Sequence, residues 1–391
     1  MYIPYGRQDV SEADIEAVVD VLRSDFLTQG PSVPAFEKAV SDYCGAKYAL
    51  ATNSATSALH IACLALGVGP EDWVWTTPVT FVASANCARY CGAQVDFVDI
   101  DAQTYNMSVD RLAEKLAQAK TQGKLPKAVI PVHLCGQACE MEAIHALSKQ
   151  YGFHIIEDAS HAIGGRYKGK PIGNCEYSSI TVFSFHPVKL ITTGEGGMAL
   201  TNDPKLAVHM ARLRSHGITR ETSEMTHASD GPWYYQQLEL GFNYRMTDIQ
   251  AALGLSQMKR LDEFVTKRHS IAARYEKLLD NIPVTRPWQH PDSYSGLHLY
   301  VIRLKLDAIK ATHKELFERL RTAGIGVNLH YIPVYRQPYY AKMGFNPNDF
   351  PEAERYYKEA ISLPMYPTLT EQEQEEVVQR LVTPIGYQTI F

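Results

Sequence analysis

The sequence predicts an α/β protein with a mostly parallel central sheet in a large first domain, followed by a smaller C-terminal α+β domain. From about residue 48 to residue 201, short apolar runs alternate with helical stretches, which is typical of strand–helix–strand units. The chain has 391 residues, more than one domain usually contains. A long helical pattern begins at Thr247, and we therefore expect domains at residues 1–259 and 260–391.

The first expected element is a helix over Ser11–Ser24. Its apolar residues recur at helical spacing, and Ser11 with Asp14 resembles a capping box. The alternating region that follows contains the expected strands and helices of the sheet layer. The strands are expected at Tyr48–Ala51, Val95–Val98, Ala128–His133, His154–Ile156, Ile180–Phe183 and Met198–Leu200, and helices at Ser57–Leu66 and Met141–Tyr151.

The last third of the chain starts with a helix whose N-cap is Thr247, with Gln250 as its capping partner. The helical pattern continues to about Leu279, so we expect one helix that bridges the two domains. Four further elements are expected beyond it. They are strands at His298–Leu304 and Val327–Leu329, a helix from Thr312 to a stop at Gly324, and a last helix from about Thr370.

Composition and charge argue against several classes of partner. Lys and Arg total 38 against 43 Asp and Glu, a net charge of −5, and no basic block could neutralise a run of phosphates, so nucleic acid is not an expected partner. Apolar runs are far shorter than the roughly 18 residues of a membrane span, so no membrane contact is expected. The first residues, M-Y-I-P-Y-G-R, do not resemble an export signal, and we expect a cytoplasmic location.

The cysteines predict neither a disulfide framework nor a metal site. Their number is seven, which is odd, as expected for thiols in a reducing compartment. Cys87 with Cys91 and Cys135 with Cys139 have C-x3-C spacing rather than the C-x2-C of a structural zinc site. We expect no metal, and small buried thiols are the ordinary interpretation.

A first candidate constellation is T-N-S-A-T-S-A-L, which runs from Thr52 to Leu59. A strand here passes into small hydroxyl residues that open a helix. Main-chain N–H groups at a helix N-terminus suit a phosphate, although Ser and Thr are also ordinary N-caps.

A second constellation, H-I-I-E-D-A-S-H-A-I-G, places Asp158 at the end of a strand expected to be buried on both faces. A buried carboxylate needs a cationic or hydrogen-bonding partner, and a pyridinium N–H is one such partner. A helix cap is the alternative role for Asp158, and His161 alone is more often a packed core histidine.

A third constellation, F-S-F-H-P-V-K-L-I-T-T-G-E-G-G, contains Ser184 and Lys189. The apolar residues around Lys189 predict a lowered amine pKa, which suits a Schiff-base nucleophile. The alternative is a lysine that extends from an apolar turn to water.

Two further motifs complete the set. T-P-V-T-F-V-A-S-A-N places Phe81 at the start of a helix, where its ring could stack on a planar group or pack in the core. G-F-N-Y-R-M-T-D-I-Q-A-A-L places Asn243 just before the long helix. Together the five motifs supply a phosphate cradle, a ring stack, a partner for a protonated ring nitrogen and an amine. These are the requirements for binding pyridoxal phosphate.

In their order along the chain, D-A-S-H-A-I-G, F-S-F-H-P-V-K and G-F-N-Y-R-M-T-D-I-Q-A-A-L resemble the sugar-nucleotide aminotransferases of the DegT/StrS family. The resemblance covers essentially the whole chain. It implies the fold-type I architecture of pyridoxal phosphate enzymes and a homodimer with shared active sites. His161 stands where many relatives carry Gln, and this is similar to the branch that makes UDP-4-amino-4,6-dideoxy-N-acetyl-β-L-altrosamine for pseudaminic acid synthesis.

The resemblance also implies roles for individual residues. Lys189 and Asp158 would be catalytic, the first as the Schiff-base lysine and the second as the partner of the pyridine nitrogen. The implied cofactor-binding residues are Lys189, Asp158, Ala55, Thr56, Phe81, His161, Ser184 and, from a second subunit, Asn243. The implied substrate-binding residues are Tyr5, Asp25, Phe26, Leu27, Thr28, His330, Tyr331, Ile332 and Pro333. Arg336, beside the last group, is a candidate for the UDP pyrophosphate.

The implied reaction moves the amino group of L-glutamate, which becomes 2-oxoglutarate, to C4 of a UDP-linked 4-keto-6-deoxy-N-acetylhexosamine. An aminotransferase for another nucleotide-linked ketosugar is an alternative, because function depends on the pocket rather than on the fold. A 4-keto-sugar 3-dehydratase of similar fold would carry histidine in place of Lys189. A ligand-sensing protein without turnover is the alternative of a different class.

Overall fold

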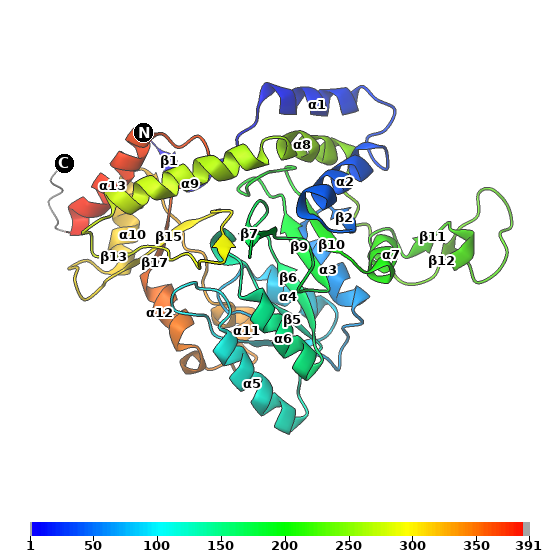
Figure 1. Cartoon of the computed structure of the whole chain (residues 1–391), viewed down its shortest axis with the longest axis horizontal. Coiled ribbons are helices and arrows are strands. Elements are labelled where there is room, and N and C mark those ends of the chain that lie inside the picture. The colour runs from blue at the N-terminus through cyan, green and yellow to red at the C-terminus, as the bar shows by residue number, and fades with distance from the viewer. Residues whose placement is uncertain (1, 386–391) are drawn as a thin grey trace.

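A seven-stranded sheet forms the centre of the computed structural model, which describes residues 2–385 (Figure 1). The strand order is β2-β10-β9-β6-β5-β3-β4, and all neighbours are parallel except β10, which is antiparallel to both β2 and β9. The strands are β2 (Tyr48–Thr52), β3 (Trp73–Thr76), β4 (Gln94–Phe97), β5 (Ala128–Ile130), β6 (His154–Asp158), β9 (Ile180–Ser184) and β10 (Gly197–Thr201). The predicted α/β class with a mostly parallel sheet is confirmed.

Helices cover both faces of this sheet, as its continuous apolar strands require. One face packs on α3 (Ala55–Ala65), α4 (Ala83–Tyr90) and α7 (Pro204–Leu213). The opposite face packs on α2 (Ser32–Cys44), α5 (Val109–Gln122), α6 (Met141–Tyr151) and α8 (Asp248–Met258). The strand β3 had no counterpart among the predicted elements, because its two tryptophans in W-V-W-T do not form a run of aliphatic residues.

The predicted single helix from Thr247 to about Leu279 is wrong, because the structure divides it into α8 and α9 (Leu261–Leu278). Arg260 between them has φ −111° and ψ 5°, outside helical geometry. Its guanidinium binds Asp14, with Nη2 2.7 Å from Oδ2, and also the carbonyl oxygen of Asp9 at 2.8 Å. A contact with the N-terminal helix α1 (Glu12–Leu22), which no local pattern reports, therefore accompanies the break.

The C-terminal part contains a small antiparallel sheet in the order β13-β15-β17. Its strands are β13 (Val284–Thr285), β15 (Tyr300–Leu304) and β17 (Ala360–Leu363), and its helices are α10 (His313–Thr322), α11 (Pro338–Ala341), α12 (Pro351–Glu359) and α13 (Glu371–Ile385). The strand predicted at Val327–Leu329 is wrong: β16 (Ile325–Gly326) lies earlier, and Asn328 forms only a bridge to Ser362.

The N-terminus joins this C-terminal part. Strand β1 (Ile3–Pro4) pairs in parallel with β16, and Ile3 packs in the apolar cluster of the C-terminal helices. The division at residues 259 and 260 stays a prediction, although the break between α8 and α9 lies at that position.

Two peripheral sheets complete the fold. The first contains β7 (Arg166–Tyr167), β8 (Lys170–Pro171) and β14 (Ser293–Tyr294). The second is the hairpin of β11 (Ile218–Thr219) and β12 (Gln236–Gln237), which projects from the body at the right of Figure 1. Within residues 2–385, no helix combines the length and the apolar character that a membrane crossing needs.

Candidate active site

The candidate residues gather where parallel strands end, the edge at which ligands bind in open α/β sheets. Asp158 is the last residue of β6 and Ser184 the last residue of β9. Phe81 lies in the segment between β3 and α4. Neighbouring strand ends therefore bring together residues from three separate motifs.

Asp158 is 5% exposed and is held by donors on two sides. Its Oδ2 accepts a hydrogen bond from Ser84 Oγ at 2.6 Å, and its Oδ1 accepts one from the amide of Ser160 at 3.1 Å. Both donors are neutral, so the buried carboxylate has no hydrogen-bonded cation among the described residues. A protonated ring nitrogen would supply the missing charge.

Lys189 lies in the turn that follows β9, where its amide donates to the carbonyl of His186 at 2.9 Å. Its side chain is half-buried, between neighbours that include the fully buried Leu190. Burial lowers the pKa of Lys189 to about 8, although the charge of Asp158 opposes the shift. About a tenth of the amine is therefore neutral and nucleophilic at pH 7, far more than for an ordinary lysine.

A row of residues across three strands places Ser184 beside the start of α3. In the sheet register, Gly197 of β10 is opposite both Ser184 of β9 and Thr52 of β2. A Cβ atom added to Gly197 would lie 2.4 Å from the amide nitrogen of Ala55, so only glycine permits this approach.

The N-terminus of α3 presents the groups that a phosphate needs. Ser54 is its N-cap and accepts from the amide of Ser57 at 3.1 Å. The amides of Ala55 and Thr56 belong to the first turn, where no carbonyl is available one turn earlier in the helix. Together with the nearby Ser184 hydroxyl they form a cradle for an anion.

Phe81 keeps 58% of its surface exposed, which is unusual for a large apolar ring beside a core. Its ring centroid lies 6.1 Å from that of Tyr331, at an angle of 52°. The amide of Val334 donates to the carbonyl of Pro78 at 2.9 Å, and this bond fastens the 330–334 loop to the Phe81 segment. Phe81 is free to cover a planar ligand.

His161 is buried between the two halves of the site. Its Nδ1 accepts from the amide of Cys135 at 3.3 Å, which leaves Nε2 as the N–H that donates to Tyr331 Oη at 3.1 Å. Burial, followed by the charge of Lys189, keeps the pKa of His161 well below its ordinary value. The imidazole is neutral and has a defined tautomer.

Tyr5 and His330 extend the site toward the C-terminal part. Their ring centroids are 5.2 Å apart, and His330 is 5.0 Å from Tyr331. Burial lowers the pKa of His330 to about 3, with a smaller effect from Lys189, so this ring is also neutral. In the same loop Ile332 is exposed and Pro333 is buried.

The candidate pyrophosphate ligand Arg336 is already paired. Its Nε donates to Glu354 Oε1 at 2.8 Å, and its Nη2 contacts the second carboxylate oxygen of Glu354. A bidentate pair of this kind uses the face of the guanidinium that a phosphate would need. The structure therefore argues against the expected role of Arg336.

Two expected groups lie apart from this cluster. Asp25–Thr28, with Phe26 and Leu27 between them, is an exposed segment beside α8, where the amide of Asp248 donates to the carbonyl of Leu27 at 3.0 Å. Asn243 is exposed and pairs through its main chain with Ser215. Within residues 2–385, no hydrogen bond or ring contact links either group to Lys189 or His330.

The structure adds two residues that the sequence motifs did not single out. Ser84, which binds Asp158, stands in T-P-V-T-F-V-A-S-A-N, three residues after Phe81. His298 has its ring centroid 4.4 Å from that of His161. Ser84 could have been predicted, because it lies three residues after Phe81, one helical turn further along the chain. His298 is more than a hundred residues from His161, and no pattern in the sequence near either histidine indicates their contact.

The residues present fit pyridoxal phosphate in each of its polar parts. The α3 cradle suits the phosphate, Asp158 a protonated pyridine nitrogen, Phe81 the ring face and the Lys189 amine the aldehyde. Within residues 2–385, no cluster of three or more His, Cys, Asp or Glu side chains has the geometry of a metal site.

The pKa of Lys189 makes covalent capture of pyridoxal phosphate dependent on pH. Since the neutral amine is the nucleophile, the initial capture rate should rise with pH and level off above about pH 8. Stopped-flow absorbance and borohydride trapping measure this rate. A rate that still rises steeply near pH 10, as expected for an ordinary lysine, would contradict the assignment, and Lys189→Arg should give no adduct at this position.

Removing the Ser84 hydroxyl should weaken cofactor binding through Asp158. A hydrogen bond to a charged group contributes about 1.5–3 kcal/mol, so Ser84→Ala should raise the Kd of pyridoxal phosphate about ten-fold. Titration of the cofactor-free protein measures this Kd. Ser148→Ala is the control, because its buried hydroxyl donates only to the carbonyl of His145 in its own helix. Equal Kd values for the two variants would contradict the role of Ser84.

Comparison with known proteins agrees with this geometry. The family model described as the DegT/DnrJ/EryC1/StrS aminotransferase family matches residues 8–382. The spore coat polysaccharide biosynthesis protein SpsC of Bacillus subtilis is 39% identical over 381 residues, with 97% of this chain and 96% of that protein covered. The UDP-4-amino-4,6-dideoxy-N-acetyl-beta-L-altrosamine transaminase of Campylobacter jejuni is 39% identical over 365 residues, covering 93% and 92%.

Among solved structures, the aminotransferase PseC of Helicobacter pylori, involved in the biosynthesis of pseudoaminic acid, superposes with a TM-score of 0.88. It is 31% identical to this chain, and the match covers 98% of this chain and 99% of that one. The family model and the relatives extend over nearly the whole sequence, and amino-group transfer is a reaction that a reactive lysine beside a buried aspartate can serve. The chain is a sugar aminotransferase and belongs to the DegT/DnrJ/EryC1/StrS family.

Proposed function

We propose that this protein uses pyridoxal phosphate to move the amino group of L-glutamate to C4 of a UDP-linked 4-keto-6-deoxy-N-acetylhexosamine. The sugar substrate would be UDP-2-acetamido-2,6-dideoxy-β-L-arabino-hexos-4-ulose, and the product UDP-4-amino-4,6-dideoxy-N-acetyl-β-L-altrosamine. The observation that carries the proposal is the juxtaposition of a half-buried lysine of lowered pKa with a buried aspartate that lacks a cationic partner. The names of the Campylobacter and Helicobacter relatives support the choice of sugar.

When bound, pyridoxal phosphate supplies a conjugated ring that accepts electrons as a carbon–hydrogen bond breaks. Asp158, fixed by Ser84, would keep the ring nitrogen protonated. Lys189 Nζ would take a proton from the amino-bearing carbon of glutamate and deliver one to C4 of the sugar. General acid–base transfer of this kind contributes roughly 10²–10⁴ in rate.

Residues from both parts of the chain would orient the sugar. Burial raises the pKa of Tyr331, so its hydroxyl stays protonated and can donate while it accepts from His161. Tyr5 and His330 pack beside it, and the exposed Ile332 adds an apolar surface. We propose Asp25, Phe26, Leu27 and Thr28 as further contacts, made when the ligands and a second subunit are present.

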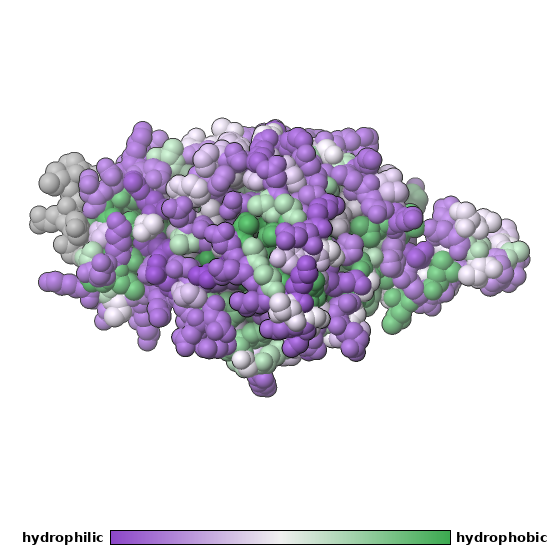
Figure 2. Space-filling model, turned by 60° about the horizontal axis from the view of Figure 1, so that its bottom comes forward, coloured by the Kyte–Doolittle hydropathy of each residue, from purple (hydrophilic) through white to green (hydrophobic). Residues whose placement is uncertain are grey.

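We also propose that the active unit is a homodimer in which Asn243 reaches the phosphate cradle of the partner subunit. Asn243 is exposed in the single chain, at the base of the projecting hairpin. Figure 2 shows apolar surface on this projection and near its base, and the large exposed side chains of the region include Trp233, Tyr235 and Leu240. Exposed apolar surface of this kind is typical of an interface.

Purified protein with L-glutamate and the proposed UDP-ketosugar should give parallel lines in double-reciprocal plots, since two half-reactions share one amino carrier. Coupled detection of 2-oxoglutarate and mass spectrometry of the nucleotide sugar measure both products. Lys189→Ala should lose at least about 10²-fold in rate. Near wild-type turnover by Lys189→Ala would contradict the proposal.

Assays with several nucleotide-linked ketosugars decide between the proposed sugar substrate and its alternatives. The chain is equally identical to SpsC, which is named for spore coat polysaccharide biosynthesis, and this makes another nucleotide-linked ketosugar the second candidate. Assays with both C5 epimers of the UDP-4-keto-6-deoxy-N-acetylhexosamine and with a ketosugar that lacks the acetamido group compare kcat/KM directly. Preference for a different ketosugar would retain the aminotransferase chemistry and overturn the proposed substrate.

The shared site can be tested by mixing two inactive variants. Lys189→Ala and Asn243→Ala should each be inactive or nearly so, whereas a reassembled equimolar mixture should recover about a quarter of wild-type activity. Recovery occurs because each mixed dimer contains one site with both native residues. An absence of recovery in mixed dimers that are shown to form would contradict the contribution of Asn243 across the interface.

A further inference from the structure

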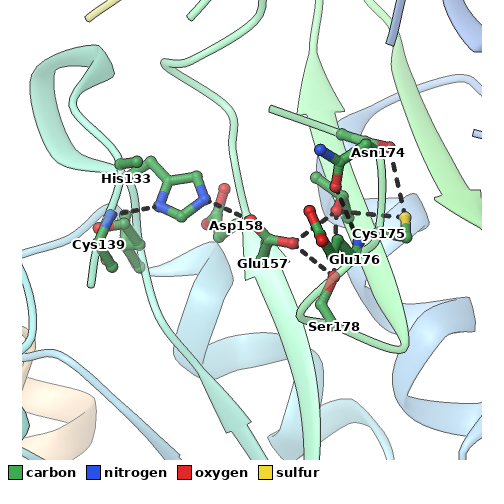
Figure 3. A network of polar contacts seen from close by, with 12 residues as sticks. His133, Cys139, Glu157, Asp158, Asn174, Cys175, Glu176 and Ser178 are labelled. Atoms are coloured by element: carbon green, nitrogen blue, oxygen red, sulfur yellow. Dashed lines mark hydrogen bonds and ion pairs between the residues drawn. The ribbon is translucent and has the colours of Figure 1, made fainter. Parts of the chain in front are cut away.

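Glu157 is a buried carboxylate that directly precedes Asp158 on β6. Consecutive strand residues face opposite sides of a sheet, so Glu157 points away from the face that Asp158 serves. Figure 3 shows the Glu157 side chain between His133 and Ser178. It is 6% exposed and accepts from Ser178 Oγ at 2.5 Å and Thr181 Oγ1 at 3.0 Å. Its other oxygen, Oε2, lies 2.7 Å from Nε2 of His133.

Glu157 is therefore ionised in the interior. Burial by itself would raise the pKa of Glu157, but the hydrogen bond from His133, together with the two hydroxyl donors, holds it below its ordinary range. A buried anion with this many donors is costly to build and strongly destabilising to disturb. Within residues 2–385, none of these side chains forms a hydrogen bond with Asp158, His161 or Lys189, so the proposed chemistry does not account for them.

His133 connects Glu157 to the loop that follows β5. Its ring is completely buried, and its Nδ1 accepts from the amide of Cys139 at 3.1 Å, which leaves the Nε2 N–H for Glu157. The main-chain amide of His133 donates to the carbonyl of Asp158 at 3.0 Å, and the amide of Asp158 donates to Pro131 at 2.9 Å. The loop is thus joined to the Glu157–Asp158 pair by side chain and by main chain.

The same loop determines the orientation of His161. The amide of Cys135 donates to His161 Nδ1, and Cys135 adopts a left-handed φ of 61° to do so. A Cβ atom added to the next residue, Gly136, would lie 2.9 Å from the carbonyl oxygen of His161 and 2.7 Å from the amide of Leu297. The loop is therefore tightly packed at Gly136. A displacement of His133 would move Cys135 as well, because no empty space beside the loop could accommodate it.

We propose that Glu157 and His133 are positioning residues for the cofactor-binding side chains Asp158 and His161. Glu157 orients the His133 ring, His133 holds the 131–139 loop, and the loop holds both the main chain of Asp158 and the tautomer of His161. Neither positioning residue touches the ligands. The inference rests on the proposed function, because it concerns how the pyridoxal phosphate site is held.

The test compares two buried carboxylates that are changed to amides. Glu157→Gln keeps size but removes the charge, and His133→Asn removes the ring. Asp14→Asn is the matched control, because Asp14 is also fully buried but is bound by Arg260 and Gln257 and, within residues 2–385, has no hydrogen bond to the 131–139 loop. Three quantities are measured for each variant: the Kd of pyridoxal phosphate, the pH midpoint of the visible band of the holoprotein, and the Tm of the cofactor-free protein.

Glu157→Gln and His133→Asn should each raise the Kd about ten-fold and lower the spectral midpoint by about one pH unit. The midpoint falls because a nearby anion that favours the protonated form is lost or displaced. The double variant should be little worse than either single variant, since both act through one chain of contacts. Asp14→Asn should lower Tm but leave the Kd and the midpoint unchanged.

If Glu157→Gln kept the wild-type Kd and pH midpoint, the inference would be overturned. It would also be overturned if Asp14→Asn changed the Kd and the midpoint as much as Glu157→Gln does, because the effect would then be a general loss of stability. If Glu157→Gln does not fold, Ser178→Ala, which removes one donor to Glu157, should give a smaller shift in the same direction, and no shift would overturn the inference. Failure of the proposed function has a different signature: the wild-type protein itself would show no visible band and no trapped adduct at Lys189.

Discussion

The burial of one carboxylate at the end of a central strand is the constraint on which the site depends. Asp158 ends β6 between β5 and β9, where both faces of the sheet are covered, and its bonds to Ser84 and Ser160 satisfy its oxygens without neutralising its charge. A charge left in that state is tolerable only if a cation arrives. The carboxylate of Asp158 therefore needs a positively charged partner, and a protonated pyridine ring can be that partner. The amine of Lys189 lies close by, and burial disfavours its charged form.

Main-chain packing converts this requirement into a binding site. The row formed by Ser184, Gly197 and Thr52 lies across β9, β10 and β2, and the missing side chain of Gly197 allows the start of α3 to approach. The antiparallel strand β10 is what brings this row to the same edge as Asp158. The phosphate cradle at the start of α3 and the carboxylate of Asp158 therefore lie on one edge of the sheet, and the strand spacing sets the distance between them. A phosphorylated pyridine needs this arrangement.

The site is shared between the sheet and the C-terminal part. Tyr331 contacts His161 on one side and Phe81 on the other, while Tyr5 brings the N-terminal strand to His330. Four segments far apart in the sequence therefore meet around neutral imidazoles, whose protonation is suppressed by burial.

The sequence by itself determined the elements and residues whose signals are local. Capping boxes at Ser11, Thr247 and Thr312 marked helix starts, apolar runs marked six of the seven central strands, and the motifs pointed to Lys189 and Asp158 as chemistry at strand ends. Helix capping and strand burial involve neighbours within a few residues, or a face that alternates along one strand. Such signals can be read without knowing the fold.

Only the tertiary structure decided what depends on partners distant in the chain. Arg260 ends a helix through contacts with Asp9 and Asp14, and Arg336 is occupied by Glu354. His298 packs on His161, and Glu157 is ionised because His133, Ser178 and Thr181 surround it. The charge state and availability of a side chain are set by everything within a few ångströms of it, and the sequence does not state which distant residues those will be.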